Sequence, residues 1–436
     1  MNDHSSQPLL ARIFSSSTAK RFVAGYRRVF SIHEVEESSI LRYGFGLLLL
    51  SHFVMFFGLV DERTTSISSY LSGHYSCWSY FQDCGRWFFL QSLPYGYSQE
   101  IFYAGILALV VITGYFITRK EWVLAHMGLA VLWLWKFLVI YVISNAHMGN
   151  YDKYDIYLGM ALLFFARKLF FVRLTFVTLY FCASTIKIHE GWILGTYFTS
   201  LATGMPIFPD AIVPFMTNLV IFMQIVGCWF LLSENKKLQR AAFVYFICFH
   251  MYSSILVAYR YLVSALPPLL LYFGHDFKAE KPPLDKKSIA GWLLIGFLFL
   301  SQSIGLMIPG DQKLTLEGNF YGLYMFEANH QCISQTVIYF ADGTSASGKQ
   351  EHAVPRYRCD PYQTWFVLHQ ACERSAKPIS SIRWTFDHSI NGGPFYRIVD
   401  VEDACRLEYH PFSHNQWIKT EFDHPAISGY PVKNFY

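Results

Sequence analysis

The chain has 436 residues, of which 53% are hydrophobic, 18% aromatic and only 15% charged. Soluble domains carry about 25% charged residues, so the composition excludes a disordered tail protein, a collagen, a coiled coil and an ordinary cytosolic enzyme. The formal net charge of +4 is small and gives no argument for nucleic-acid binding. An apolar surplus of this size is typical of a polytopic membrane protein, because such side chains can face lipid.

Nine apolar runs predict an all-α transmembrane bundle, since a bilayer core needs about 20 mostly apolar residues per helix. The runs cover residues 39–60, 100–118, 122–144, 154–166, 174–187, 211–233, 241–260, 261–274 and 288–309. The fourth, fifth and eighth runs are short. The eighth contains Pro267 and Pro268, which predict a bent or re-entrant segment because proline removes a helical hydrogen bond.

Basic connections alternate with connections that are poor in Lys and Arg. The basic ones hold Arg12, Lys20, Arg21, Arg27 and Arg28; Arg119 and Lys120; Arg167, Lys168 and Arg173; Lys236, Lys237 and Arg240; and Lys278, Lys281, Lys286 and Lys287. The positive-inside rule then predicts a cytoplasmic N-terminus, and nine crossings place the C-terminal tail outside. Eight crossings would place the tail inside, so the predicted side of the tail depends on whether the short eighth run crosses the membrane.

The leader, residues 1–38, is not expected to be a cleavable signal peptide, because the first long apolar run starts only near residue 39. Residues 20–30 predict a basic amphipathic helix on the inner membrane face, and a solvated basic arm is the alternative. The transmembrane domain is predicted to cover residues 39–309.

Residues 310–436 change character, because charges rise and long apolar runs vanish. Residues 334–340, 380–386 and 395–409 read as extended, with turn signals at Asp342-Gly343 and between the last two segments. The tail is therefore predicted to be a small β-rich extracytoplasmic domain.

Six of the nine cysteines fall on the predicted outer side, an even number, as a disulfide framework requires. The candidates are Cys77, Cys84, Cys332, Cys359, Cys372 and Cys405. The alternative is six unpaired thiols in a cytosolic tail, and the sequence does not choose among the pairings. No metal site is predicted, because His330, Cys332, His352 and His369 match no standard zinc spacing and are interpreted as scattered loop residues.

Ionisable residues inside predicted spans are candidates for function, because they are costly in lipid. Lys136 lies near the outer end of the third run, where its alternative is to snorkel into the interface. His250 lies mid-span, where its alternative is a buried neutral histidine. Lys187 ends the fifth run and shares a helical face with Tyr180 and Ser184. A desolvated lysine beside a tyrosine hydroxyl is a plausible proton-transfer pair, and snorkelling is again the alternative.

Three blocks of this sequence resemble the horizontally transferred transmembrane (HTTM) domain family, which includes vitamin K-dependent gamma-carboxylase. They are residues 38–46; Tyr180, Phe181, Ala183, Lys187, Trp192 and Gly195; and Phe249, His250, Ser254, Leu256 and Pro267-Pro268. The resemblance covers residues 35–275. It implies a Lys187 base toward reduced vitamin K or another quinone, assisted by His250 and Tyr180, and a lyase-type carboxylation of a secreted peptide or protein. Tyr154 stands where the family has a functional histidine.

Two classes of function remain open. One is a membrane enzyme that modifies a peptide or lipid-soluble substrate at the outer face. The other is a non-catalytic receptor, immunity or scaffold protein that binds a partner through its tail. A transporter ranks below both, because the sequence has no matching halves with interrupted helices. The absence of nucleotide-binding and hydrolase motifs argues against ATP-driven chemistry. A bacterial inner membrane is the expected location.

Overall fold

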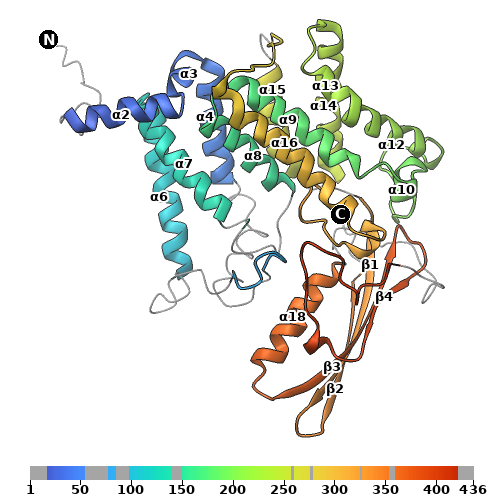
Figure 1. Ribbon diagram of the computed structural model, residues 1–436. Helices are drawn as coiled ribbons and strands as arrows, with labels where there is room; N and C mark the ends of the chain where they lie inside the picture. Colours follow the sequence, from blue (N-terminus) through green and yellow to red (C-terminus); the bar gives the residue numbers. More distant parts are fainter. Residues whose placement is uncertain are drawn as a thin grey trace, which may run out of the picture. The chain divides into compact units, whose positions relative to one another are not determined.

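The computed structural model describes residues 17–54, 77–84, 98–138, 141, 150–256, 260–274, 278–324, 327–352 and 359–420. This part of the chain is mostly helical, with a small antiparallel sheet toward the C-terminus (Figure 1). Arg12 and most of the connections 61–99 and 145–153 lie outside the described residues. Predictions for those segments are therefore not addressed by the structure.

The chain divides into two compact units. The first comprises Met1–Tyr75, Asp83–Val177 and Leu231–Gly296. The second comprises Ser76–Gln82, Thr178–Phe230 and Phe297–Tyr436. The first unit is helical, whereas the second combines helices with the sheet.

The helices of the first unit follow its apolar runs. They are α2 (Ser17–Val29), α3 (Ile32–Glu37), α4 (Ser39–Phe53), α6 (Ser98–Thr118), α7 (Trp122–Leu138), α8 (Asn150–Phe164), most of α9 (Lys168–Thr185), α14 (Lys236–Leu256), α15 (Arg260–Phe273), η8 (Lys286–Ser288) and the start of α16 (Ile289–Ile304). Helix α15 packs against α4 and α8. A close approach requires glycine there, because a Cβ at Gly44 would lie 2.7 Å from the Tyr272 hydroxyl oxygen.

Two predictions for this unit have direct outcomes. Residues 20–30 do form a helix, since α2 covers most of them, and Arg27 and Arg28 occupy its last turn. Pro267 and Pro268 do not end the helix, because α15 contains both prolines, and the prediction of a bent or re-entrant segment stays a prediction. A proline costs its own backbone hydrogen bond, and α15 packs against α14, α4 and α8.

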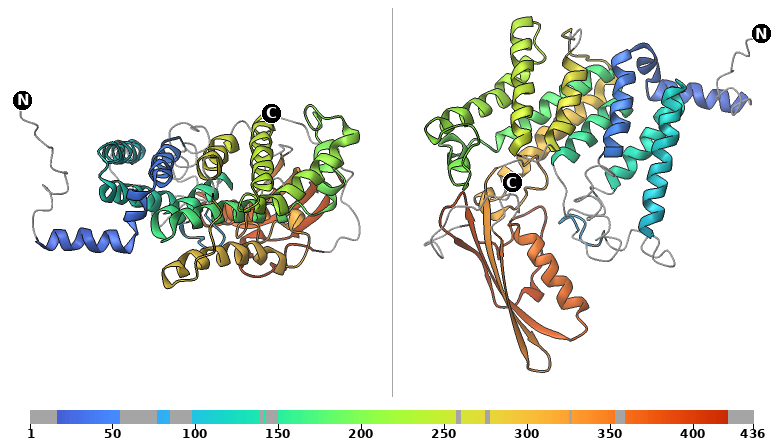
Figure 2. Two further views of the ribbon diagram at one scale, coloured as in Figure 1. Left: turned by 90° about the horizontal axis from the view of Figure 1, so that it is seen from above. Right: turned by 180° about the vertical axis from the view of Figure 1, so that it is seen from behind.

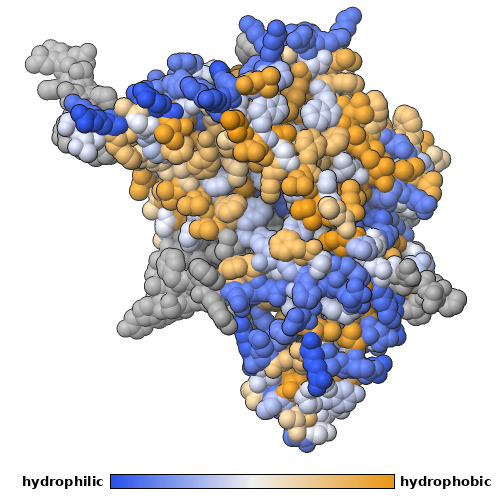
Figure 3. All heavy atoms as spheres, viewed as in Figure 1, coloured by the Kyte–Doolittle hydropathy of each residue, from blue (hydrophilic) through white to orange (hydrophobic). Residues whose placement is uncertain are grey.

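Three helical segments among the described residues are long and apolar enough to cross a membrane. They are Lys168–Thr185, Asp210–Phe230 and Lys286–Met307, and shorter apolar helices cover Tyr103–Thr118, Trp122–Leu138 and Leu262–Phe273. Figure 3 shows hydrophobic side chains gathered over the helical part of the visible face. Three segments are fewer than the nine predicted, because helices such as α8, with 15 residues, fall short of a full span.

The sheet of the second unit has four antiparallel strands in the order β2-β1-β3-β4. Figure 2 shows this sheet, in orange and red, from behind. The strands are β1 (His330–Phe340), β2 (Ser345–His352), β3 (Ile379–Ile390) and β4 (Tyr396–Val401). The extended segments predicted at 334–340 and 380–386 are confirmed, whereas only the first part of 395–409 is a strand. Strand β2 and the helix α18 (Pro361–Arg374), which packs against β3, were not predicted.

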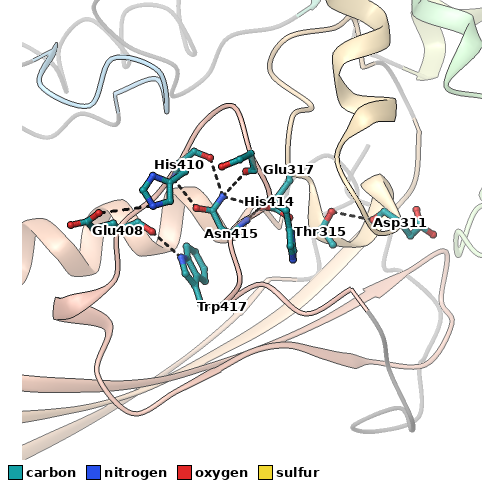
Figure 4. A network of polar contacts seen from close by, with 9 residues as sticks. Asp311, Thr315, Glu317, Glu408, His410, His414, Asn415 and Trp417 are labelled. Carbon is teal, nitrogen blue, oxygen red and sulfur yellow. Dashed lines mark hydrogen bonds and ion pairs between the residues drawn. The ribbon is translucent and has the colours of Figure 1, made fainter.

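Short helices complete the second unit. They are α10 (Glu190–Ile193), α11 (Thr196–Thr199), η6 (Asp210–Ile212), α12 (Val213–Phe222), the π-helical turn η7 (Met223–Gly227), α13 (Cys228–Phe230), η9 (Gly305–Met307), α17 (Gln312–Thr315) and η10 (Ala404–Arg406). The buried carboxylate of Glu317 holds the segment that follows η10. It accepts hydrogen bonds from His414 Nδ1 at 2.7 Å and from the backbone and side-chain nitrogens of Asn415 at 2.8 and 2.9 Å (Figure 4). These hydrogen bonds tie the segment of His414 and Asn415 to Glu317 and have a structural role.

The predicted disulfide framework is confirmed. Cys332 bonds to Cys359, and Cys372 of α18 bonds to Cys405 of η10. Cys77 and Cys84 are disulfide-bonded as well. The remaining cysteines are free thiols, namely Cys182, Cys228 and Cys248. Disulfides of this kind are typical of proteins exposed to an oxidising compartment.

Candidate functional site

Lys187 lies in the second unit, just beyond the end of α9 and outside the candidate span Lys168–Thr185. Its side chain is only 2% exposed. The Lys187 Nζ atom donates a hydrogen bond to Gln224 Oε1 at 2.7 Å, and Ser184 Oγ donates to the same oxygen at 2.7 Å. A neutral amide therefore holds the buried amine, and the serine hydroxyl fixes that amide.

Gln224 comes from the π-helical turn η7, which lies within an otherwise apolar helical run. The wider turn of a π-helix displaces side chains from their usual face, and such turns are frequent at functional sites. Gln224 is 1% exposed, so its amide needs internal partners, and Lys187 and Ser184 provide them.

An aromatic cluster flanks the amine. The Nζ atom of Lys187 lies 5.0 Å from the centre of the Trp192 ring, within the range of a cation–π contact. Trp192 stacks on Tyr197 with ring centres 5.2 Å apart and meets the edge of Phe198 at 5.7 Å. Gly195 allows the turn between α10 and α11, because its φ of 77° is unfavourable for other residues.

Burial governs the protonation of Lys187. Loss of hydration lowers the pKa of the Lys187 amine to about 7, and the negative charge of Glu327 opposes this shift. Near neutral pH, the side chain therefore exists as both ammonium and free amine. A free amine in a dry environment is what a general base requires.

Glu327, whose charge acts on Lys187, lies near two histidines. Glu327 is 3% exposed, and its Oε1 atom lies 3.7 Å from His330 Nε2. The backbone carbonyl of Glu327 accepts a hydrogen bond from His189 Nε2 at 2.8 Å. His189 Nδ1 in turn accepts from the backbone N–H of Gly191 at 3.1 Å, which caps α10. These contacts fix His189 in a single neutral tautomer.

His330 and His388 face each other across the pairing of β1 with β3. Their Nδ1 and Nε2 atoms are 3.0 Å apart, and His388 Nδ1 lies 2.6 Å from the carbonyl oxygen of Leu314. Burial lowers the pKa of His388 to about 3, so this imidazole is neutral at physiological pH.

The predicted site residues divide between the two units. Tyr180 and Lys187 belong to the second unit, and Tyr180 is buried in α9. Because α9 ends at Thr185, Lys187 follows the helix, and it meets Ser184 through Gln224. His250 belongs to the first unit, where it is buried in α14 with its ring 5.3 Å from that of Phe249.

Two interpretations of individual residues are wrong. Lys136 does not snorkel, because its side chain is fully buried and forms an ion pair with Asp155. The histidines of the tail are not loop residues, since His330 lies in β1, His352 in β2 and His369 in α18. Cys332 is a disulfide partner. Among the described residues, no group of three or more His, Cys, Asp or Glu side chains is arranged to hold a metal ion.

Sequence reasoning missed Gln224, Glu327 and His388. One signal was available for Gln224, a polar residue inside an apolar run, which is a candidate for function by the argument that identified Lys187. The chain matches no protein-family model, no curated protein and no solved structure. The arrangement itself combines a buried amine, a carboxylate and an imidazole, which together can accept and hold a proton.

Proposed function

We propose that this chain is an integral membrane enzyme that removes a proton from a peptide or lipid-soluble substrate at the outer membrane face, with Lys187 as the base. The observation that carries the proposal is the environment of Lys187, a buried amine hydrogen-bonded to the neutral amide of Gln224. Such an amine can lose and regain a proton near neutral pH.

The topology within this proposal is nine spans, a cytoplasmic N-terminus and an extracytoplasmic tail in a bacterial inner membrane. Three long apolar helices and the disulfides of the tail support it. The alternation of basic and non-basic connections supports the sidedness. Membrane lipid would surround the bundle.

The resemblance to the HTTM family extends the proposal to a carboxylase-like, lyase-type reaction with a reduced quinone or vitamin K as cofactor. Trp192 and Tyr197 form an aromatic stack beside the Lys187 amine, which suits a planar ring. A quinol bound there would, on reaction with molecular oxygen as the oxidant, supply the stronger base that such a reaction needs. The chain's own contribution is to orient the ring, exclude water and hold a proton at Lys187 Nζ. Tyr180, which belongs to the same unit as Lys187, is proposed to assist.

The test compares the wild type with Lys187→Met. Lipid extracts of the detergent-purified proteins are analysed by mass spectrometry for a bound quinone. The masses of the peptides secreted by the strains that express each protein are measured in the same way. We expect a quinone and a mass-shifted peptide with the wild type, and loss of both with Lys187→Met. Lys377→Met is the control, because Lys377 is an exposed lysine in the same unit. If Lys187→Met leaves the peptide masses unchanged from the wild type, the proposed function is wrong.

A binding function remains the second candidate, since Tyr154 stands where the family has a functional histidine. A tyrosine can donate a hydrogen bond but carries no positive charge near neutral pH. In that case the disulfide-bonded tail would engage a partner as a receptor, immunity or scaffold protein. Lys187→Met would then leave partner binding intact, whereas the double variant Cys372→Ser, Cys405→Ser would abolish it.

A further inference from the structure

Helix α2 has two faces of different chemistry. Tyr26 and Val29 follow Phe22 by four and seven residues, so these three side chains share one face of the helix. The opposite face carries the basic residues of the helix, Lys20, Arg21, Arg27 and Arg28. What α2 can bind therefore depends on which parts of each face are already in contact with the rest of the first unit.

Tyr26 holds the middle of the apolar face against α7. Its hydroxyl donates a hydrogen bond to His126 Nδ1 at 2.7 Å, and His126 Nε2 donates to the carbonyl oxygen of Leu163 at 2.9 Å. The Tyr26 ring lies 4.6 Å from that of Phe30, whose ring lies 5.0 Å from that of His126. These contacts fix how α2 is rotated about its own axis.

The flank of the same apolar face is uncovered. Phe22 is 56% exposed and Val29 is 69% exposed, although both lie on the face that carries Tyr26. Because the contact of Tyr26 with His126 fixes the rotation of the helix, α2 cannot turn these two side chains into the protein. Their burial requires something outside the described part of the chain.

The basic face is directed away from α7. Arg27 pairs with Glu36 of α3, whereas Lys20, Arg21 and Arg28 are exposed. Three exposed cations beside an uncovered apolar flank match a membrane surface, where anionic head groups lie next to acyl chains. A nucleic acid would use the cations alone and leave Phe22 and Val29 in water.

The direction of α2 agrees with such a surface. In Figures 1 and 2, α2 runs at a steep angle to α6. Both α6 and α7 contain apolar segments, and the contact of α2 with α7 lies near the start of α7, next to the exposed residues Arg119 and Lys120. If the apolar helices run across a bilayer, α2 lies along its surface on a side that is rich in basic residues.

We propose that α2 lies on the membrane and binds anionic phospholipid, with Phe22 and Val29 inserted beside the acyl chains. Lys20, Arg21 and Arg28 contact the lipid phosphates, and their long side chains reach the head groups from a helix at this depth. Tyr26 is the positioning residue that orients both faces. The inference is independent of the chemistry proposed for Lys187.

The first test locates two positions of α2 relative to the bilayer. A nitroxide label is attached to Val29→Cys or to Ala24→Cys in the full chain, reconstituted in vesicles of phosphatidylcholine and phosphatidylglycerol. Cys248→Ser removes the exposed free thiol, and the other two free thiols are buried. Ala24 is the matched control, because it is exposed on the basic face, four residues from both Lys20 and Arg28.

Both positions are exposed in the folded chain, so only a membrane or another partner distinguishes them. Electron paramagnetic resonance compares collisions of each label with dissolved oxygen, which concentrates in lipid, and with a water-soluble nickel complex. We expect a several-fold higher ratio of oxygen to nickel collisions at residue 29 than at residue 24.

The second test asks whether charge selects the lipid. The ratio at residue 29 is expected to be higher in vesicles that contain phosphatidylglycerol than in vesicles of phosphatidylcholine alone. The test variant should lose this difference, because it replaces three exposed basic residues of α2: Lys20→Gln, Arg21→Gln and Arg28→Gln. The control variant should retain it, because it replaces three exposed basic residues at the start of α14: Lys236→Gln, Lys237→Gln and Arg240→Gln.

Three other outcomes would overturn the proposal. Equal ratios at residues 24 and 29 in both kinds of vesicle would mean that α2 is a solvated basic arm. A label at residue 29 that lies equally deep in neutral and anionic vesicles would reject the selection of anionic lipid. Few collisions with either reagent at both positions would mean that a protein surface, from a partner or a second copy of the chain, covers α2 instead of lipid.

Discussion

The two units each bury a lysine, and the two lysines have opposite surroundings. Lys136, in α7 of the first unit, is fully buried and forms an ion pair with Asp155 of α8. Asp155 also accepts a hydrogen bond from Ser51 Oγ at 2.6 Å, which fixes the carboxylate. Lys187, in the second unit, is almost as buried but donates to the neutral amide of Gln224.

This difference teaches that the partner, and not burial alone, decides what a buried lysine can do. A carboxylate in direct contact holds the ammonium in its charged state, because losing the proton would leave an unpaired buried anion. An amide makes no such demand, so the amine can gain and lose a proton. Lys136 therefore links helices, whereas Lys187 is suited to chemistry.

The largest expected effect comes from breaking the Lys136 pair. Asp155→Asn leaves a buried ammonium without its counter-ion and should destabilise the protein by about 3–5 kcal/mol. Denaturant unfolding in detergent measures this. The combined Lys136→Met and Asp155→Leu variant should recover much of the loss, because no charge is then buried. If Asp155→Asn is as stable as the wild type, the Lys136–Asp155 pair does not stabilise the fold.

Lys187→Met is the matched comparison in the other unit. Its stability should lie within about 1 kcal/mol of the wild type, because removing the amine costs one hydrogen bond to a neutral group and also removes a buried charge. A loss as large as that of Asp155→Asn would contradict the distinction between the two lysines.

The second prediction converts one environment into the other. Gln224→Glu places a carboxylate against Lys187, as Asp155 lies against Lys136, and should raise the pKa of Lys187 by about 1–3 units. Acetic anhydride acetylates only the free amine, so the pH at which half of Lys187 is acetylated should rise. Peptide modification at neutral pH should fall. Gln312→Glu, in the same unit, keeps the acceptor for the Tyr324 hydroxyl and serves as the control. An unshifted midpoint would mean that Gln224 does not set the protonation of Lys187.

Much of the fold follows from local sequence patterns. Apolar runs predicted the long helices, extended segments and turn signals predicted most of β1 and β3, and an even number of cysteines on the predicted outer side predicted the disulfides. Strand β2 was missed because its residues are polar and almost all exposed, so no apolar face marks it. The single residue Lys187 was identifiable because lysine is costly inside an apolar run.

The partners of the lysines were not predictable, because they depend on tertiary packing. Asp155 lies 19 residues from Lys136, and Gln224 lies 37 residues from Lys187. Nothing in the spacing shows that these helices meet with these faces. The same holds for His330 and His388, whose contact depends on the register between β1 and β3. The sequence therefore located a lysine of interest but not the groups that determine its chemistry.

The smallest expected effect concerns the pH dependence of stability in the second unit. The pKa of His388 falls from 6.5 to about 3 on folding, because the buried imidazole cannot be hydrated when charged. The unfolded chain then binds a proton below pH 6.5 that the folded chain rejects. Stability contributed by His388 is complete above pH 6.5 and falls by about 1.4 kcal/mol per pH unit as the pH drops toward 3.

Unfolding free energies in detergent at several pH values between about 7 and 5 measure this slope. His388→Phe should be less stable at neutral pH, because His330 loses an acceptor, but its slope should be shallower than that of the wild type by one proton. An unchanged slope in His388→Phe would show that His388 is not a buried neutral imidazole that accepts a hydrogen bond from His330. The contrast between the titrating His388 of the second unit and the Lys136–Asp155 ion pair of the first unit would then weaken.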